Sequence, residues 1–219
     1  MPAFLLVAGR AGPRLDLVEL GPSAGLNLVW DRYRYGYGQT SWGPEDAPLE
    51  LQGDLRRPFP PELLSVPVEV RRRRGIDLNP IDVTTEDGAQ LLECFVWADQ
   101  AERIGRLRRA IDALRGDPPE LISGDYVDLL PTVLAERDPA ALTVVFQTAS
   151  LGYLSSERRA QLLGCIERAG REGPLAFLTT AFDPEVEGGF PLELTIWPAD
   201  WKRRLAHMDF HGAWLEWLL

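Results

Sequence analysis

An apolar run that ends in a glycine turn, at residues 15–27 (LDLVELGPSAGLN), constrains the fold of this chain most. The run ends at Glu19, and Gly21 and Gly25 then bracket a turn of small residues. This pattern predicts a strand, a tight loop and a helix. A strand that feeds a helix in this way leaves backbone N–H groups and a positive dipole end at the loop, so we expect a ligand to bind there.

Strand-like and helix-like segments alternate along residues 15–180. After the first strand we expect further strands at residues 66–76, 120–123, 142–147 and 175–180. Apolar residues with helical spacing predict helices at residues 24–31, 86–116 (one or two helices), 127–136 and 155–171. Such alternation is typical of an α/β fold with a mainly parallel sheet covered on both faces.

Two further segments complete the expected architecture. Residues 191–197 and 205–210 read as strands that pair antiparallel, giving a mainly parallel sheet of seven strands with an antiparallel terminal strand. Residues 32–66, rich in proline, glycine and acidic residues, predict a long irregular insertion after the first helix. The whole chain, 1–219, is expected to form a single domain.

Composition excludes several classes of function. The formal net charge of −10 repels the phosphate backbone, so we expect no nucleic-acid partner. No apolar run approaches the roughly 20 residues that cross a bilayer. Since the amino terminus also lacks the basic start of a signal peptide, we expect a cytoplasmic protein with no membrane partner. A small molecule or a protein is left as the partner, and the oligomeric state stays open.

A serine hydrolase is one interpretation of the glycine turn, because residues 21–25 also spell the nucleophile elbow G-x-S-x-G. Ser23 would be the nucleophile, Asp183 the orienting acid, and His207 or His211 the base, which is the chain order of an α/β-hydrolase. Against this interpretation, only one short possible strand, residues 4–8, precedes the serine. The two histidines do not suit a metal site, since four residues of strand at about 3.3 Å each hold their rings too far apart.

Several motifs together carry a resemblance to a known family. The segments ELGPSAGLN, WDRYRY and RRGIDLNPIDV, and a tryptophan-containing helix like WADQAER, resemble those shared by a bacterial family of unknown function. That family is similar to the class I methyltransferases that use S-adenosylmethionine. The resemblance implies a Rossmann-like three-layer fold with a terminal hairpin strand, S-adenosylmethionine as cofactor, and methyl transfer to a small-molecule acceptor.

The resemblance also implies where the amino-acid part of the cofactor binds. It would lie on the loop formed by Glu19, Gly21, Ser23, Gly25 and Asn27, with Glu19 close to its ammonium group. Class I methyltransferases have an acidic residue followed by G-x-G-x-G at this point. Here Ser23 replaces the middle glycine, which adds bulk where the backbone approaches the ligand.

Three later positions are implied to bind the rest of the cofactor. Asp77, or else Asp82, would accept hydrogen bonds from the ribose hydroxyls. Asp125 would face the adenine amino group while Tyr126 packs on its ring, and Thr148 would border the methyl donor and acceptor. All of these positions fall at the carboxyl ends of expected strands, where open α/β sheets bind ligands.

Simpler interpretations of the same residues stay open. Asp77 can initiate a turn before Asn79-Pro80, and Asp125 can be the N-cap of the helix that follows it. The insertion would shape the acceptor pocket, with Tyr33, Tyr35 and Trp42 as its lining, although such aromatic residues also pack in cores. A domain that binds a nucleotide-like ligand without catalysis is a third interpretation, beside methyltransferase and hydrolase.

Overall fold

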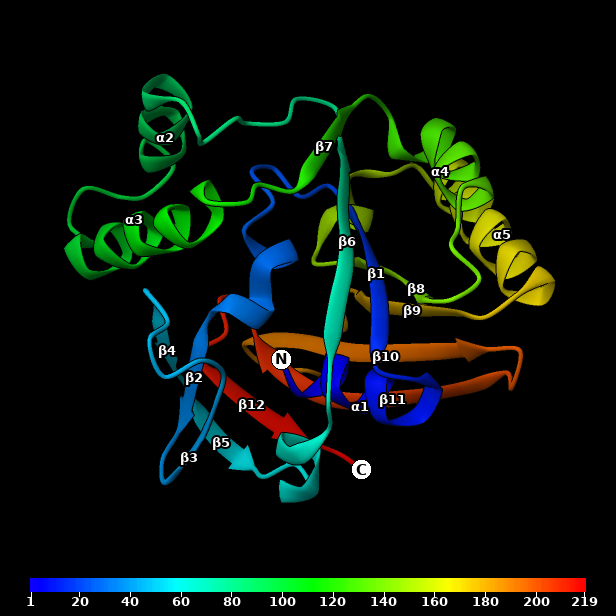
Figure 1. The fold of residues 1–219 in the computed structure, drawn as a ribbon, viewed down its shortest axis with the longest axis horizontal. Coiled ribbons are helices and arrows are strands. Elements are labelled where there is room, and N and C mark those ends of the chain that lie inside the picture. The colour runs from blue at the N-terminus through cyan, green and yellow to red at the C-terminus, as the bar shows by residue number, and fades with distance from the viewer.

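The structure is a computed structural model that describes residues 1–219, and a sheet of nine strands dominates it (Figure 1). The strands are β1 (Arg14–Leu20), β5 (Asp54–Arg57), β6 (Glu69–Asp77), β7 (Glu120–Ser123), β8 (Leu142–Gln147), β9 (Leu175–Thr180), β10 (Gly189–Trp197), β11 (Trp201–Asp209) and β12 (Trp214–Trp217). Their order across the sheet is β5-β12-β11-β10-β9-β8-β1-β6-β7. The expected mixed α/β architecture is confirmed.

Five neighbouring strands, β7-β6-β1-β8-β9, run parallel. The chain leaves β1 for β6 and β7 on one side, and then returns to β8 on the other side of β1. Consecutive connections therefore diverge between β1 and β8. This topological switch is the place where the loops at the carboxyl ends of neighbouring strands leave a crevice.

The remaining strands make the sheet larger than predicted. β10 is antiparallel to β9, β11 to β10, and β12 to β11, so the expected antiparallel pairing near the carboxyl terminus is confirmed. The prediction of seven strands is wrong because β12 continues the antiparallel part and β5, from the insertion, pairs parallel to β12 at the sheet edge.

The insertion is ordered rather than irregular. Its strands β2 (Arg34–Tyr37), β3 (Thr40–Trp42) and β4 (Glu50–Gln52) form a second, three-stranded sheet, and a short 3-10 helix η2 (Pro61–Ser65) follows. β3 and β4 are only three residues long, too short for an alternating apolar pattern to stand out among proline and glycine.

Five α-helices and two further 3-10 helices accompany the sheets. They are α1 (Pro2–Ala11), η1 (Leu26–Arg32), α2 (Glu86–Glu93), α3 (Ala101–Arg115), α4 (Tyr126–Ala135), η3 (Ser150–Tyr153) and α5 (Ser156–Glu172). The possible strand at residues 4–8 is instead part of α1, because a short apolar run fits a buried helix as well as a strand. None of these helices has the length and apolarity needed to cross a membrane.

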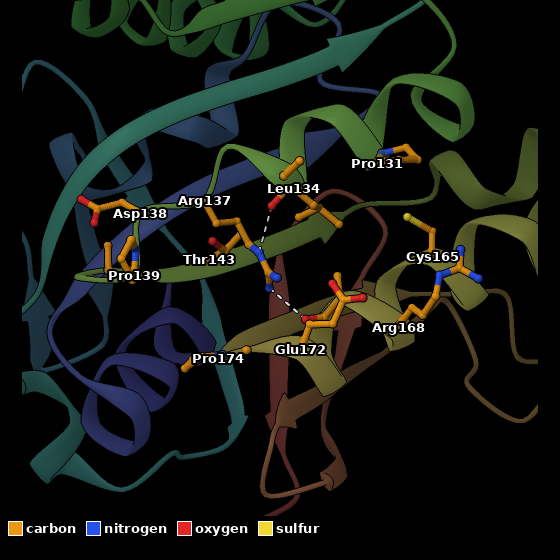
Figure 2. A pocket seen from close by; sticks show the side chains of 14 residues that line it. Pro131, Leu134, Arg137, Asp138, Pro139, Thr143, Cys165, Arg168, Glu172 and Pro174 are labelled. Carbon is orange, nitrogen blue, oxygen red and sulfur yellow. Dashed lines mark hydrogen bonds between the residues drawn. The ribbon is translucent and has the colours of Figure 1, made fainter.

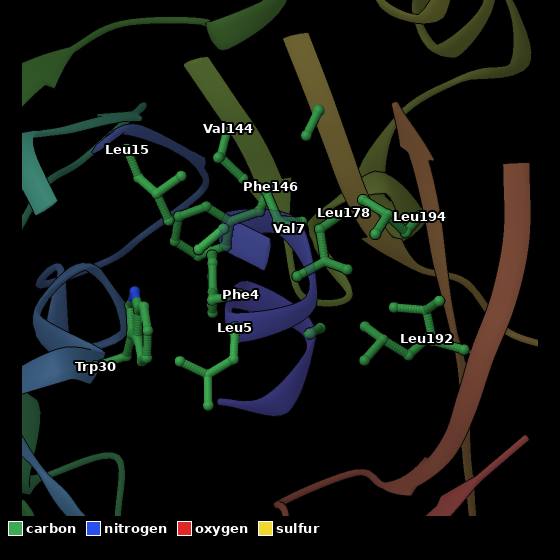
Figure 3. Packing of buried hydrophobic residues seen from close by; sticks show 14 of the residues in the cluster. Phe4, Leu5, Val7, Leu15, Trp30, Val144, Phe146, Leu178, Leu192 and Leu194 are labelled. Carbon is green, nitrogen blue, oxygen red and sulfur yellow. The ribbon is translucent and has the colours of Figure 1, made fainter. Parts of the chain in front are cut away.

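Side chains alternate between the two faces of β1 and join two separate cores. Leu15 and Leu17 pack with α1 on one face, where Phe4 stacks on Trp30 with ring centroids 4.7 Å apart (Figure 3). On the other face, Val18 and Leu20 pack with α4 and α5. Helices thus cover both faces of the parallel part of the sheet (Figure 1).

The close approach of β6 to the loop after β1 gives a stability prediction. A Cβ atom on Gly75 would lie 2.6 Å from Pro22 Cγ and 2.9 Å from Leu121 Cδ2. We expect Gly75→Ala to lower the free energy of unfolding by about 1–3 kcal/mol through overpacking, measured by urea denaturation. Gly164→Ala on α5 is the control, because nothing lies within 4 Å of its new Cβ and alanine favours a helix. Equal stability of Gly75→Ala and wild type would contradict this packing.

Candidate functional site

The sequence-predicted site residues gather at one edge of the sheet. The glycine loop follows β1, Asp77 ends β6, Asp125 follows β7, and Thr148 follows β8. Because these strands are parallel neighbours, their carboxyl ends lie together at the switch between β1 and β8.

The glycine loop has a strained backbone that the protein holds in place. Gly21, Ser23 and Gly25 have φ angles of 72°, 56° and 80°, in the left-handed region that glycine adopts easily and serine does not. Ser23 N–H donates to Asp77 Oδ2 at 2.8 Å, and Ile81 N–H donates to Ser23 O at 3.0 Å. The two bonds fix Ser23 from both sides, so the loop is preorganised against the end of β6.

Packing within the protein accounts for both glycines of the loop. A Cβ on Gly21 would lie 2.8 Å from Ser150 Cβ, and a Cβ on Gly25 would lie 2.8 Å from Pro119 Cγ. Larger residues would collide with these neighbours. The simple interpretation of the loop as a tight turn therefore explains its glycines without a ligand.

The helix expected at residues 24–31 is shorter and of another type. The loop leads into the 3-10 helix η1, which has seven residues and a break in helical geometry at Val29. Leu28 and Trp30 pack in the core beside α1, whereas Val29 packs in a separate core with Tyr33 and Tyr35, so this segment is buried on two sides. The expected short helix is thus confirmed, in the form of a 3-10 helix with a break at Val29.

Glu19 is the most unusual group at this edge. Its side chain is only 1% exposed, Asn27 Nδ2 donates to its Oε1 at 2.8 Å, and its Oε2 is buried without any hydrogen-bond partner. The pKa of Glu19 is raised to about 7, chiefly because the group is buried; the Asn27 hydrogen bond opposes this rise, and the negative charge of Asp77 adds to it. The folded protein therefore holds a buried carboxyl group with one hydrogen-bonded oxygen, one unpartnered oxygen and no cationic partner.

Both oxygens of Asp77 accept backbone hydrogen bonds. Oδ2 binds Ser23 N–H, and Oδ1 binds Asn79 N–H at 2.9 Å, so the turn interpretation of this residue is confirmed. Each oxygen has a further lone pair. Asp82 makes a separate local turn, in which Oδ1 accepts from the N–H and hydroxyl of Thr84, and these bonds lower its pKa.

Asp125 and Tyr126 have structural partners as well. Asp125 Oδ1 accepts Val127 N–H at 2.8 Å, which confirms the N-cap interpretation, and its Oδ2 pairs with Arg158 at 2.6 Å. The Tyr126 ring belongs to the core under α4, and its hydroxyl donates to Ser150 O at 3.2 Å. Burial raises the pKa of Tyr126, so the phenol stays neutral.

The turn after β8 contains a residue that the sequence analysis missed. Thr148 is exposed there, but the buried Ser150 donates its hydroxyl to Leu20 O at 2.7 Å and so joins this turn to the end of β1. A serine just beyond an expected strand end was the available signal. It is too common a residue in turns to stand out.

The aromatic residues expected in an acceptor pocket lie in the core instead. The hydroxyls of Tyr33 and Tyr35 donate to Leu26 O and Trp30 O, and both rings are buried. Trp42 stacks on Trp30 with ring centroids 5.2 Å apart. These side chains fix the second sheet to η1, so the core interpretation of Tyr33 and Tyr35 is confirmed, and Trp42 packs partly buried against the same core.

The structure does not assemble a hydrolase triad. Four strand steps separate β11, which carries His207, from β1, or roughly 19 Å at about 4.8 Å per step. His207 Nδ1 lies 3.4 Å from Glu216 Oε2, and Asp183 pairs with Arg204 at 3.0 Å. Ser23 therefore has neither the expected base nor the expected acid beside it.

A cavity of about 500 Å³ lies at the opposite edge of the sheet, between the carboxyl-terminal ends of α4 and α5 (Figure 2). Arg137 lies along it and donates to Leu134 O and Ala169 O, both at 2.9 Å. This arginine satisfies carbonyl groups at two helix ends. The cavity thus has a structural explanation and is remote from the glycine loop.

Comparison with known proteins gives one family. Residues 1–217 match a family described as "Uncharacterized protein conserved in bacteria (DUF2332)". No curated protein matches the chain.

The buried carboxyl group predicts how stability depends on pH. An ordinary glutamate has a pKa of 4.5 when unfolded, and Glu19 has about 7 when folded, so the folded state keeps a proton that the unfolded state loses between these values. Wild-type stability should fall as pH rises from 4.5 to 7 on this account. We expect Glu19→Gln to be more stable than wild type by about 3 kcal/mol at pH 8 and equal to it near pH 4, in urea titrations at each pH. A pH-independent difference would contradict the raised pKa.

The hydrogen bonds of Asp77 give a second prediction. Asp77→Ala removes the acceptor for two backbone N–H groups, so we expect a loss of about 2 kcal/mol in the free energy of unfolding. Ser23→Ala is the control, because its exposed side chain makes no hydrogen bond and the backbone bond to Asp77 is kept. If Asp77→Ala were as stable as Ser23→Ala, the conclusion that the Asp77 side chain holds the glycine loop in place would be wrong.

Proposed function

The chain belongs to DUF2332, a family of uncharacterised bacterial proteins, and we propose that it is an S-adenosylmethionine-dependent methyltransferase that acts on a small molecule. The observation that carries this proposal is the buried Glu19 carboxyl group with an unpartnered oxygen, at the end of the central parallel strand. A cationic ligand group would supply the missing partner.

The strand order supports a nucleotide-like cofactor. Numbered along the parallel strands alone, β7-β6-β1-β8-β9 is the order 3-2-1-4-5 found in doubly wound dinucleotide-binding sheets. In such sheets the ligand binds across the switch point. An antiparallel strand beside β9 is what the resemblance to class I methyltransferases implies, although here β10, β11 and β12 continue from β9 as an antiparallel meander.

The residues present fit the cofactor in two places. The Glu19 Oε2 atom matches an ammonium group, and the free lone pairs of Asp77 can accept from ribose hydroxyls while its backbone bonds persist. The adenine end fits less well. Asp125 already accepts Val127 N–H and pairs with Arg158, and the Tyr126 ring is buried in the core.

The role of the protein in this reaction is to position the reactants and to exclude water. When bound, S-adenosylmethionine would supply a methyl group on a positive sulfur: the acceptor nucleophile would bond to the methyl carbon in line as the carbon–sulfur bond breaks, and S-adenosylhomocysteine would leave with that electron pair. Glu19 and Asp77 would hold the cofactor at both sides of the preorganised loop, and the turn after β8 would border the acceptor. No protein nucleophile is needed, so the exposed Ser23 hydroxyl has no chemical role in this mechanism.

Calorimetric titration with S-adenosylmethionine and S-adenosylhomocysteine tests the proposal. We expect binding to wild type, binding at least ten-fold weaker to Glu19→Gln, and unchanged binding to Ser23→Ala, because only the first variant removes a negative charge near the ligand. If neither S-adenosylmethionine nor S-adenosylhomocysteine bound to wild type, the proposal would be wrong. Labelling of Ser23 by a fluorophosphonate probe would instead favour the hydrolase.

Binding should also depend on pH in a defined direction. A cationic ligand group favours the ionised form of Glu19. At a pH below the Glu19 pKa of about 7, the carboxyl group must therefore lose its proton before the ligand binds. We expect S-adenosylhomocysteine to bind several-fold more tightly at pH 7.5 than at pH 6 for wild type, and with little change for Glu19→Gln. Equal slopes for the two proteins would assign the pH dependence to another group.

A further inference from the structure

Three large exposed apolar side chains follow parallel strands at the carboxyl edge of the sheet. The chain has nine large exposed apolar residues in all: Leu78, Leu91, Phe95, Trp97, Tyr153, Leu163, Phe182, Phe210 and Leu219. Leu78 follows β6, Tyr153 follows β8, and Phe182 follows β9. None of the nine lies in the loops that enter β1, β6, β7, β8 or β9 at the opposite edge.

Tyr153 and Phe182 are the most exposed of the set. Their exposed fractions are 92% and 78%, so neither ring contributes to the core. Large apolar groups that stay in water at one edge of a soluble domain commonly mark a binding surface. Their position beside the switch between β1 and β8 coincides with the place where open α/β sheets bind ligands.

Hydrogen bonds fix the two loops that carry these rings to each other. Ala149 N–H, at the start of the turn that leads to Tyr153, donates to Thr180 Oγ1 at 2.9 Å, two residues before Phe182. Arg159 donates to Leu151 O at 2.7 Å and holds the same turn from α5. Two rings on loops joined in this way can bind a ligand without a large loss of backbone freedom.

We propose that Tyr153 and Phe182 bind a flat apolar ring of the methyl acceptor. The inference rests on the proposed methyltransferase function and specifies its substrate class as small ring-containing molecules. Aromatic faces pack well on flat rings, in stacked or edge-to-face arrangements. A small molecule fits better than a protein partner, since a stable protein interface needs about 800 Å² on each side, far more than two rings offer.

A matched pair of probes tests the inference. 2-Naphthol is flat, whereas decahydro-2-naphthol has the same carbon skeleton in puckered form. Ligand-observed NMR titrations use both probes with the full chain in the presence of S-adenosylhomocysteine. We expect wild type to bind 2-naphthol several-fold more tightly than the puckered probe, because only the flat ring stacks.

Variants locate the ring site. The double variant Tyr153→Ala with Phe182→Ala should bind 2-naphthol about ten-fold more weakly, and it should fold normally because both rings are exposed. Leu163→Ala is the control, since Leu163 is exposed on the outer side of α5, and it should bind as wild type does. Unchanged binding of 2-naphthol to the double variant, or equal binding of the two probes to wild type, would overturn the inference.

The same samples separate this inference from the proposed function. S-adenosylhomocysteine should bind equally to wild type and to the double variant, because neither ring is among the groups assigned to the cofactor. Failure of S-adenosylhomocysteine to bind to wild type is a failure of the methyltransferase proposal. Loss of selectivity for the flat probe while S-adenosylhomocysteine still binds is a failure of the ring site alone.

Discussion

The pairing of β1 with a parallel neighbour on each side is the constraint on which the rest of the structure depends. β6 and β8 bind the two edges of β1, and apolar side chains bury both of its faces. At the end of this strand the chain turns sharply, through the positive φ angles of Gly21, Ser23 and Gly25. The left-handed loop after Leu20, its contact with β6 through Ser23, and its contact with the turn after β8 through Ser150 all follow from this enclosure of β1.

The same enclosure puts Glu19 in a position that is poor for folding. A buried carboxyl group without a cationic partner costs stability near neutral pH, and an apolar residue in its place would extend the core next to Leu17. Groups of this kind occur where a site is assembled at the expense of the fold. Asp77 and Asp125, in contrast, have enough partners within the protein to account for their positions without a ligand.

Sequence patterns predicted β1, β8 and β9 well because each is a short, mostly apolar run, whereas β6 contains four consecutive arginines and was predicted from the alternating valines at its start. They also placed Glu19, Asp77 and Asp125 at strand ends, because the position of a residue relative to a strand follows directly from the order of residues in the sequence. They failed at α1, where a short apolar run fits a helix as well as a strand, and at the short strands β3 and β4. The partners of the site residues were beyond prediction, since each hydrogen bond joins residues brought together only by the fold.

The long crossover between β6 and β7 differs from the rest of the domain in how it is attached. Helix α2 has no buried residue, and its most specific tie to α3 is the exposed pair of Glu93 with Arg108, at 2.7 Å and 2.8 Å. Salt screens such a pair, while apolar packing is far less sensitive to ions. Salt therefore weakens the ion pair between α2 and α3, while the apolar contact of Ala89 and Leu92 with the core that includes Ile111 of α3 persists.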